Sequence, residues 1–343
     1  MKSVYKYIRI PILLFFAASI MYAGGEQRIG TSGSAQLLIP VGARGISMGG
    51  ASVASTYGVE ALHWNPAGAA NMNSLVDVTF SHMNYIADIG IEYGAVAAKI
   101  EGFGVLSLNI KALSVGEILI TTTQDPDGTG ATFSPQMLTA GLGYSRLLTD
   151  QISVGVVAKF ISETLGKVDA SGFAFDVGVM YKDLGNINGL SFGIAMKNIG
   201  PQMKYDGAGL LIQAESNDLN RPPQYYKTEA AAYELPSSFE LGFAYSRSLD
   251  NVNMVQLVGN YQNNNFSSDE YKIGGEYNYN NILFIRGGYI MAPDVDAENY
   301  IYGLSAGVGL NYEVEGVNLT VDYAFRDVQY FEANHVFQIS FGF

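Results

Sequence analysis

The sequence feature that most constrains the fold is an alternation of apolar residues with polar or small ones, which recurs from residue 75 to the end of the chain. In residues 316–328, for example, Val317, Leu319 and Val321 are separated by polar side chains. A period of two is typical of β-strands whose opposite faces meet different surroundings. The sequence therefore predicts an all-β fold built from many short strands.

About fourteen segments show this pattern, each roughly ten residues long, which is the length that a tilted transmembrane strand needs. They lie at residues 75–86, 88–100, 103–120, 133–148, 151–165, 171–183, 190–199, 236–248, 253–265, 270–279, 282–291, 301–314, 316–328 and 334–343. Beyond the N-terminal region, no stretch reaches the roughly 18 uninterrupted apolar residues of a membrane-spanning helix. We therefore expect a transmembrane antiparallel β-barrel, since only helices and closed barrels pair every backbone polar group in hydrocarbon.

The connections between these segments alternate in length. Four of them are tight: Leu148–Gln151, Asp250–Asn253, Asn278–Asn281 and Glu313–Asn318. Three are long and polar: Thr121–Thr132, Gly200–Leu235 and Ala292–Tyr300. If the tight turns face the periplasm, every long loop lies outside, as in outer-membrane barrels. We therefore expect an outer-membrane protein with its N-terminus and C-terminus in the periplasm.

The last strand ends the chain on an apolar face. Phe337, Ile339, Phe341 and Phe343 share that face. A bare apolar edge strand invites aggregation, whereas a barrel closes it against the first strand. The ending in Phe also resembles the signal by which the barrel assembly machinery recognises outer-membrane barrels. Outer-membrane lipid and lipopolysaccharide are the other partners expected of such a protein.

The N-terminal region resembles a secretory signal. It carries three positive charges, then the apolar run Ile10–Ile20, with a plausible cleavage point after Ala23. The alternative is an N-terminal membrane anchor, but the apolar run is short for a membrane span. The expected organisation is a signal peptide over residues 1–23, a lead-in and hatch over 24–74, and a barrel over 75–343.

Charge and cysteine content exclude several functions. The formal net charge is −13, and removal of the signal would make the chain more acidic. An acidic chain argues against nucleic-acid binding. The absence of cysteine excludes disulfides, thiolate catalysis, zinc–sulfur sites and a lipoprotein anchor.

The stretch Gly42–Ala70 precedes the strands, is rich in small residues and holds the only tryptophan. Short helices are expected at Ile46–Ala54, Val59–His63 and Ala67–Asn71. Several strands have a face of small residues, such as Gly303, Ser305, Gly307 and Gly309. Glycine in a strand often marks the close approach of another segment or a bend. We interpret the small face as room for Gly42–Ala70 inside the lumen, with strand bending as the alternative.

The sequence gives little sign of catalysis. Its three histidines, His63, His82 and His335, are dispersed and lack metal-binding spacing, so structural roles are favoured. The acidic pairs Asp125/Asp127 and Asp294/Asp296 match no complete calcium-binding loop and are interpreted as solvated charge. We expect no enzyme activity, no catalytic residues, no metal site and no cofactor.

The motifs GARGISMGGASVA and ALHWNPAGAA resemble the signature of the PorV/PorQ family of outer-membrane proteins, which is related to FadL-type fatty-acid transporters. The matching positions are Gly42, Ala43, Arg44, Met48, Gly49, Ala51, Ala54, Trp64, Asn65, Pro66, Ala67 and Gly68. The resemblance implies a FadL-like barrel with an N-terminal hatch of short helices. The candidate hatch residues are Arg44, Met48, Gly49, Gly50, Trp64, Asn65, Pro66 and Gly68.

The resemblance implies two functions. PorV-type members act in type IX secretion and receive the C-terminal domains of cargo proteins at the outer membrane. This leads to our first hypothesis, a plugged barrel that serves protein export or surface attachment, with cargo proteins or secretion-system components as partners. FadL-type relatives pass hydrophobic molecules through a lateral opening, so the alternative is a transporter of hydrophobic small molecules. A third possibility is a porin-like barrel.

Overall fold

The computed structural model describes residues 28, 30–214, 222–295 and 300–343. The expected signal peptide, residues 1–23, lies outside the described residues.

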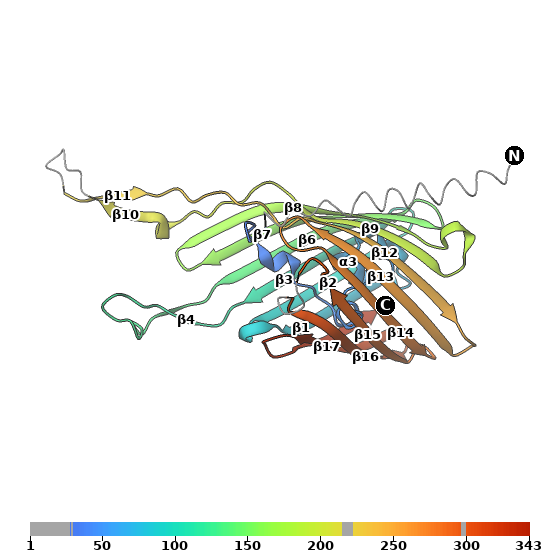
Figure 1. Cartoon of the computed structure of the whole chain (residues 1–343). Coiled ribbons are helices and arrows are strands. Elements are labelled where there is room, and N and C mark those ends of the chain that lie inside the picture. Colours follow the sequence, from blue (N-terminus) through green and yellow to red (C-terminus); the bar gives the residue numbers. More distant parts are fainter. Residues whose placement is uncertain (1–27, 29, 215–221, 296–299) are drawn as a thin grey trace.

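The chain forms a closed antiparallel β-barrel of fourteen strands, as predicted (Figure 1). Each barrel strand pairs with the next one along the chain, and the last strand closes the barrel against the first. The strands are β1 (Val76–Asn84), β2 (Gly90–Ile100), β3 (Gly104–Ser114), β6 (Gln136–Leu147), β7 (Ile152–Leu165), β8 (Val168–Tyr181), β9 (Leu190–Ile199), β12 (Ser238–Ser248), β13 (Asn253–Asn264), β14 (Glu270–Tyr279), β15 (Leu283–Met291), β16 (Tyr302–Val314), β17 (Val317–Val328) and β18 (Asn334–Gly342).

The alternation in the sequence separates the outer face of the barrel from its lumen. On β3, Leu106, Leu108 and Ile110 are exposed on the outside, whereas Asn109 and Lys111 between and beside them are buried. An apolar outer band with polar interior residues is the arrangement of an outer-membrane barrel. The sequence pattern therefore determines which side chains face lipid and which face the lumen.

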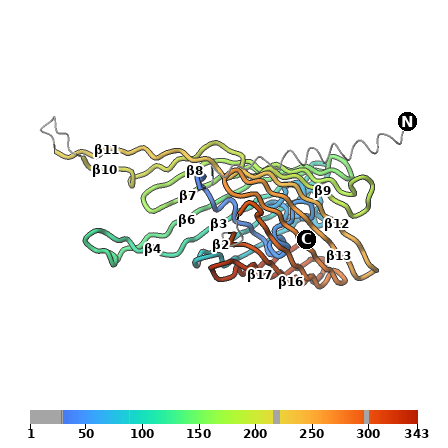
Figure 2. Tube along the Cα trace, viewed as in Figure 1, coloured from blue at the N-terminus to red at the C-terminus, as the bar shows by residue number. Residues whose placement is uncertain are grey.

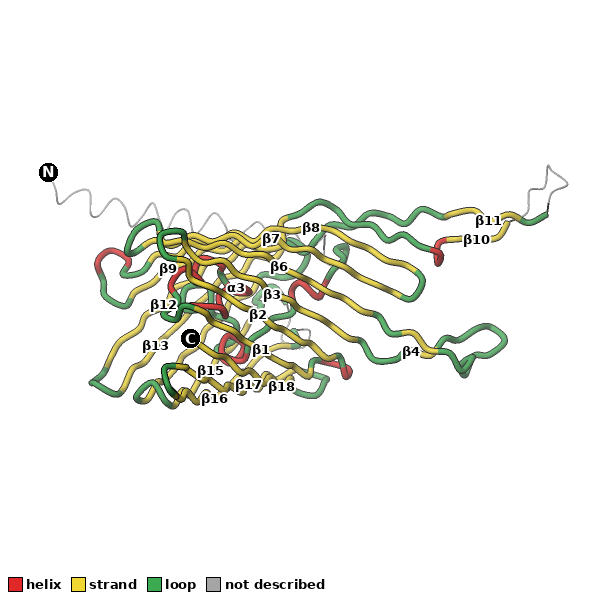
Figure 3. Tube along the Cα trace, turned by 180° about the vertical axis from the view of Figure 1, so that it is seen from behind, coloured by secondary structure: helices red, strands yellow, loops and turns green. Residues whose placement is uncertain are grey.

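The long connections emerge at one end of the barrel, which we call the long-loop end (Figures 1 and 3). The connection from β3 to β6 contains the short strands β4 (Ile118–Leu119) and β5 (Thr132–Phe133). The connection from β9 to β12 contains η7 (Ala208–Leu210), β10 (Leu211–Ala214) and β11 (Gln224–Lys227). The opposite end carries tight turns such as the one between β16 and β17, so the predicted alternation of loop lengths is confirmed.

Short helices before β1 lie inside the barrel (Figure 2). They are η2 (Ala35–Leu38), α2 (Ala43–Ser47), η3 (Gly58–Glu60), α3 (Ala61–Trp64) and η4 (Pro66–Asn71). Two further single-turn helices, η5 (Ile86–Asp88) and η6 (Leu184–Asn186), lie in connections. No helix within the described ranges is long and apolar enough to cross a membrane.

The expected helix at Ile46–Ala54 is wrong. The helix is α2, Ala43–Ser47, and it ends before Gly49 and Gly50, which both have positive φ. Such angles suit glycine and interrupt a helix. Gly58, which also has positive φ, begins η3.

The lead-in enters the lumen from the long-loop end. Arg28, the first described residue, forms an ion pair with Glu234 at 2.6 Å and donates to Asn265 at 3.2 Å. Both partners lie in connections at the long-loop end. The chain then passes through the lumen, and β1 begins at the opposite end, where Leu75 N–H bonds to the carbonyl of Phe343 at 2.7 Å. Arg28 and Phe343 therefore lie at opposite ends of the barrel, whereas the N-terminus lies outside the described residues and its periplasmic position stays a prediction.

Candidate functional site: the lumen hatch and its vestibule

We use the name hatch for residues 42–71, which fill the lumen. The wall facing them is lined by six glycines from six different strands. A Cβ on any of them would lie less than 3.0 Å from a hatch atom, a separation that real Cβ atoms essentially never show. These glycines are Gly155, Gly178, Gly193, Gly274, Gly288 and Gly307. The interpretation of the small face as room for an internal segment is therefore confirmed for Ser305 and Gly307, whereas a Cβ on Gly303 or Gly309 would meet wall side chains instead.

Met48 and Gly49 make the closest approach to the wall on one side of the hatch. Met48 is fully buried and lies against Gly274 and Gly288. Gly49 has φ 67°, and a Cβ on it would lie 2.9 Å from the backbone nitrogen of Tyr289. Both the backbone angle and the space therefore require glycine at position 49.

Asn65 connects two parts of the hatch to each other and to the wall. Its Nδ2 donates to the carbonyl of Val53 at 2.8 Å and to that of Val179, on β8, at 3.1 Å. Its Oδ1 accepts from the backbone N–H of Ala67 at 3.1 Å and so caps η4, in which Pro66 is the first residue. The Asn-Pro pair therefore ends one helix, begins the next and attaches both to β8.

Trp64 packs inside the hatch itself. Its ring lies against Gly45 and Gly50, where a Cβ on Gly45 would overlap the ring. The ring of His63 meets it edge to face at 5.0 Å. Gly68 is equally constrained, because a Cβ there would meet the carbonyl of Thr56. The small residues of the sequence motif thus allow the hatch to fold around one large side chain.

Arg44 attaches the hatch to a buried ion network on the wall. Its Nε lies 3.0 Å from Glu276, which also binds Arg286 at 2.6 Å, and Arg286 pairs in turn with Asp322. Burial alone would lower the pKa of Arg44, but the charge of Glu276 raises it above the usual value. Each buried charge has a partner of opposite sign, which is the condition under which buried ions are tolerated.

Gln338, on the last strand, holds the hatch at a second position on the wall. Its Oε1 accepts from the backbone N–H of Ala43 at 2.6 Å, and its Nε2 donates to Glu60. Burial, and then the nearby carboxylate of Asp322, raise the pKa of Glu60. Because Gln338 lies on β18, closure of the barrel also positions the hatch.

A cavity of about 360 Å³, which we call the vestibule, lies above the hatch at the long-loop end. Trp64 and Gly50 line its floor, and Lys197 and Lys272 line its wall. Lys197 pairs with Glu240 at 2.6 Å and Lys272 with Glu270 at 2.9 Å. The lead-in contributes apolar side chains such as Leu37 and Leu38. The vestibule therefore has one apolar side and one side rich in charge and hydrogen-bonding groups.

His63 also lines the vestibule. Burial, followed by the nearby charge of Lys197, lowers the pKa of His63 well below its usual value. The histidine is thus held neutral on the side of the hatch that faces the vestibule. Ser238, on the wall of the vestibule, is buried, and its hydroxyl has no hydrogen-bond partner among the described residues.

Glu163 joins the lead-in to the longest loop. This fully buried carboxylate, on β7, accepts from Ser34 and Gln36 of the lead-in. It also accepts from the hydroxyls of Tyr205 and Tyr233, which lie in the connection from β9 to β12. Neither this cluster nor the Arg44 network was predicted, because each forms between residues far apart in the sequence.

The other residues singled out in the sequence do not form a site with these groups. His82 and His335 lie on neighbouring strands at the outer wall, where His82 bonds Glu92 and His335 bonds Tyr323. No group of three or more His, Cys, Asp or Glu side chains within the described ranges could hold a metal ion. Phe337, Ile339 and Phe343 are exposed on or beside β18, and their role as an assembly signal stays a prediction.

The barrel wall is continuous around the described strands. Backbone hydrogen bonds join every two neighbouring barrel strands. The register shifts at only two places in these pairings, Phe175/Val177 and Tyr302/Ser305. The pairing of β1, β2, β3 and β6 is regular. The lateral gap that the transporter hypothesis predicts is therefore not found among these strands.

Solved structures with a similar fold include a toluene transporter, a hydrocarbon channel and a FadL homologue. The toluene transporter TodX of Pseudomonas putida shares 14% identity, with 88% of this chain and 97% of that chain covered and a TM-score of 0.56. The monoaromatic hydrocarbon channel CymD shares 14% identity over 89% and 98%, with a TM-score of 0.54. A FadL homologue of Pseudomonas aeruginosa shares 12% identity over 88% and 98%, with a TM-score of 0.53. These likenesses show the FadL-like fold.

No curated protein sequence matches the chain closely enough to count as a relative. The family model described as type IX secretion system protein PorV matches residues 22–220. This match includes the whole hatch and the first seven barrel strands. Because it extends over more than half of the chain, the chain belongs to the PorV family of type IX secretion system proteins and is an outer-membrane β-barrel.

Proposed function

We propose that this barrel is an accessory of protein export or surface attachment in type IX secretion, and that it receives cargo at the cell surface while its hatch stays in place. Family membership supports the secretion role. The partners would be secreted cargo proteins or other components of the secretion system. No step of this function requires an enzyme active site or a cofactor.

The observation that carries the proposal is the combination of a filled lumen and a vestibule at the long-loop end. The wall glycines leave the hatch no free space on the lumen wall, as the overlaps at Gly155 and Gly178 indicate. The vestibule has the hatch as its floor, and it offers apolar side chains opposite Lys197 and Lys272. A cavity with a closed floor can hold a docked group of the cargo, but it offers no passage through the barrel.

The orientation follows from the same proposal. The long loops and the vestibule would face the outside, and the tight turns and Phe343 would face the periplasm, as in other outer-membrane barrels. Arg28 would then lie at the cell surface, since it binds Glu234 in a long loop. Cleavage after Ala23 would leave a short lead-in before the hatch, and residues 337–343 would act as the assembly signal during insertion.

The second candidate function is transport of a hydrophobic small molecule. The FadL-like fold and the apolar side of the vestibule, with Leu37 and Ile290, favour it. It would require the hatch to move or the wall to open. The regular pairing of β1, β2 and β3 gives no such opening in the described state.

The proposal is tested by deleting the chain and comparing the secreted and surface-attached proteome, together with co-purification from outer membranes. We expect loss of a set of secreted proteins and recovery of cargo or a secretion component with the barrel. A vestibule variant, Lys272→Glu, should reduce cargo recovery, whereas Tyr312→Glu, on the outer face of β16, serves as the control. An unchanged proteome with no protein recovered would contradict the proposal, and a bound hydrophobic molecule would favour the second candidate.

A further inference from the structure

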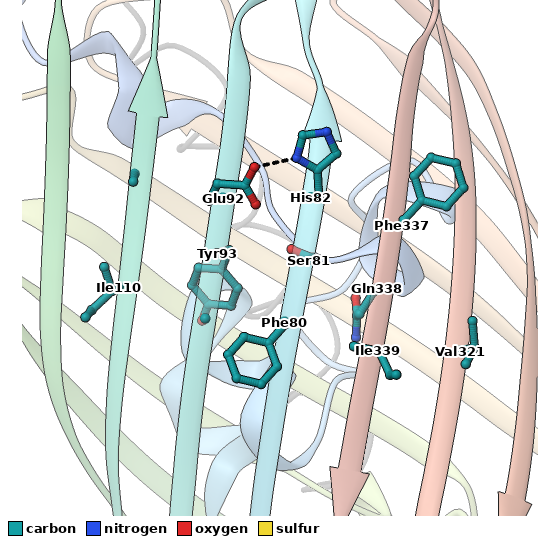
Figure 4. Close-up of a pocket in the computed structure, with 12 residues that line it drawn as sticks. Phe80, Ser81, His82, Glu92, Tyr93, Ile110, Val321, Phe337, Gln338 and Ile339 are labelled. Carbon is teal, nitrogen blue, oxygen red and sulfur yellow. Dashed lines mark hydrogen bonds and ion pairs between the residues drawn. The ribbon is translucent and has the colours of Figure 1, made fainter.

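The outer wall of the barrel carries a hollow that the hatch and the vestibule do not explain. It measures about 560 Å³ and lies over β1, β2, β3, β17 and β18. β2 and β3 place the small residues Gly94 and Ala112 here, next to the large exposed side chains of Phe80 and Ile110 (Figure 4). The hollow therefore results from two small residues among large apolar ones.

The strand register places a polar pair directly above an apolar surface. His82 lies opposite Glu92 on β2 and opposite Phe337 on β18. Two residues further from the long loops, Phe80 lies opposite Ile339. The change from charged to apolar side chains therefore occurs between adjacent rows of the outer face, and the hollow extends over both rows (Figure 4).

His82 and Glu92 form an ion pair on this outer face. His82 Nδ1 lies 2.5 Å from Glu92 Oε1, and His82 Nε2 lies 2.8 Å from Asn84 Oδ1. The Glu92 side chain remains 64% exposed, and its Oε2 has no partner within the described part of the chain. Charged side chains on the lipid face of a barrel are costly at the membrane mid-plane and tolerated near the interface. The pair therefore marks the level of the lipid headgroups.

We propose that this hollow is a binding site for one membrane lipid whose headgroup carries an ammonium group with N–H donors. The acyl chain would lie on Phe80, Ile110 and Ile339, which are exposed and apolar. The ammonium group would donate to the free carboxylate oxygen of Glu92, with which its charge is complementary.

The chemistry of the pair selects this headgroup. Both ring nitrogens of His82 are already bonded, so the group left open is an acceptor, the second oxygen of Glu92. An ammonium with N–H groups can bond to it, whereas a quaternary ammonium of the same charge cannot. The site thus predicts discrimination between two lipids that differ only in the substitution of the headgroup nitrogen.

The test uses the full chain in vesicles of equal phosphatidylethanolamine and phosphatidylcholine with the same acyl chains. Native mass spectrometry then measures which lipid stays bound after release from the membrane. A hydrogen bond to a charged acceptor predicts a preference for phosphatidylethanolamine of about tenfold. Glu92→Gln should reduce this preference to about threefold or less, because the amide lacks the charge.

Filling the hollow provides a second variant. A Cβ on Gly94 would lie 3.5 Å from the Phe80 ring, an ordinary contact, so Gly94→Leu fits the wall and should displace both lipids. Gly275→Leu, on β14, is the matched control, because its Cβ would also make ordinary contacts of 3.4 Å or more. Equal retention of the two lipids by the unaltered chain would overturn the proposal. So would unchanged lipid binding in both Glu92→Gln and Gly94→Leu, or equal loss in the control.

Discussion

The Oδ1 of Asn65 occupies the space that a Cβ on Gly178 would fill. The same side chain donates from Nδ2 to the carbonyl of Val179, the next residue of β8. Asn65 of the hatch can thus pack against Gly178 of the wall because Gly178 has no side chain. This relationship is repeated at the other glycines of the inner wall, such as Gly155 against Pro66.

Gly178→Ala should therefore loosen the hatch. Overpacking of this kind costs about 1–3 kcal/mol, because the methyl group forces Asn65 out of its position. Limited proteolysis of the folded barrel should show faster cleavage within residues 58–71. Gly275→Ala, on the lipid-facing side, should leave the cleavage rate unchanged, since its Cβ meets only ordinary contacts. Equal cleavage in both variants would contradict the fit.

Asn65→Ala should loosen the hatch more than it destabilises the barrel. The substitution removes three hydrogen bonds, each with a net contribution of about 1 kcal/mol. Trp64→Ala should act in the same direction, because it empties the space between Gly45 and Gly50. Heat-modifiable gel migration measures the stability of the barrel, and protection from protease measures how firmly the hatch is held. A parallel loss of both properties would count against separate roles.

Arg44→Gln should weaken the attachment of the hatch to the ion network. Breaking one partner of a buried ion pair typically costs about 3–5 kcal/mol. The remaining pair of Glu276 with Arg286 should keep the wall folded. Hydrogen exchange of the hatch amides measures the change. Arg28→Gln is the control, since its ion pair with Glu234 is exposed and contributes only about 0–1 kcal/mol. A larger effect of the control would contradict this account.

Acid should release the hatch. The lowered pKa of His63, caused first by burial, keeps the side chain neutral in the seated hatch. In the released hatch it would take up a proton below its usual pKa of 6.5, so the seated state loses stability as the pH falls below that value. Glu60 acts in the opposite direction, because its pKa is raised in the seated hatch. Exchange rates divided by the intrinsic rate at each pH report the opening of the hatch, which between pH 7.5 and 5.5 should therefore rise less in His63→Gln than in the unaltered chain. An equal rise of hatch opening with falling pH in both proteins would refute the role of His63.

Glu163→Gln should loosen the lead-in and the longest loop together. The amide of Gln keeps only one acceptor oxygen, whereas the carboxylate of Glu163 accepts from Gln36 and Ser34 on one oxygen and from Tyr205 and Tyr233 on the other. Protease cleavage should accelerate in both segments by a similar factor. Acceleration in one segment alone would show that Glu163 does not couple them.

The sequence was sufficient to predict the barrel, because the alternation that separates the two faces of a strand is a local property. The pattern around Val317, Leu319 and Val321 is enough to define the outer face of β17. The hatch was also located correctly, since small residues in Gly42–Ala70 match the small inner faces. Its helices were less well predicted, because the positive φ of Gly49 and Gly50 is set by contacts with the wall.

The polar clusters could not be predicted because they depend on register and closure. Glu276 and Arg286 meet through the pairing of β14 with β15. His82 and His335 are far apart in the sequence, yet closure of β1 against β18 brings them onto neighbouring strands. The course of the lead-in depends on Glu163 and Glu234, which lie more than a hundred residues away from it. A local pattern in the sequence cannot predict contacts between residues so far apart.

A reversible disulfide between hatch and wall gives the most direct test that cargo docks while the hatch stays in place. The chain contains no cysteine, so a single engineered pair can be read without interference. Asn71, in the hatch, and Ser153, on β7, are suitable because Asn71 Nδ2 donates to Ser153 Oγ at 3.1 Å. Asn71→Cys with Ser153→Cys should form a bond in the outer membrane. Secretion by cells carrying only this oxidised form should equal that of the unaltered chain. Loss of secretion on oxidation and its recovery on reduction would show instead that the hatch must move.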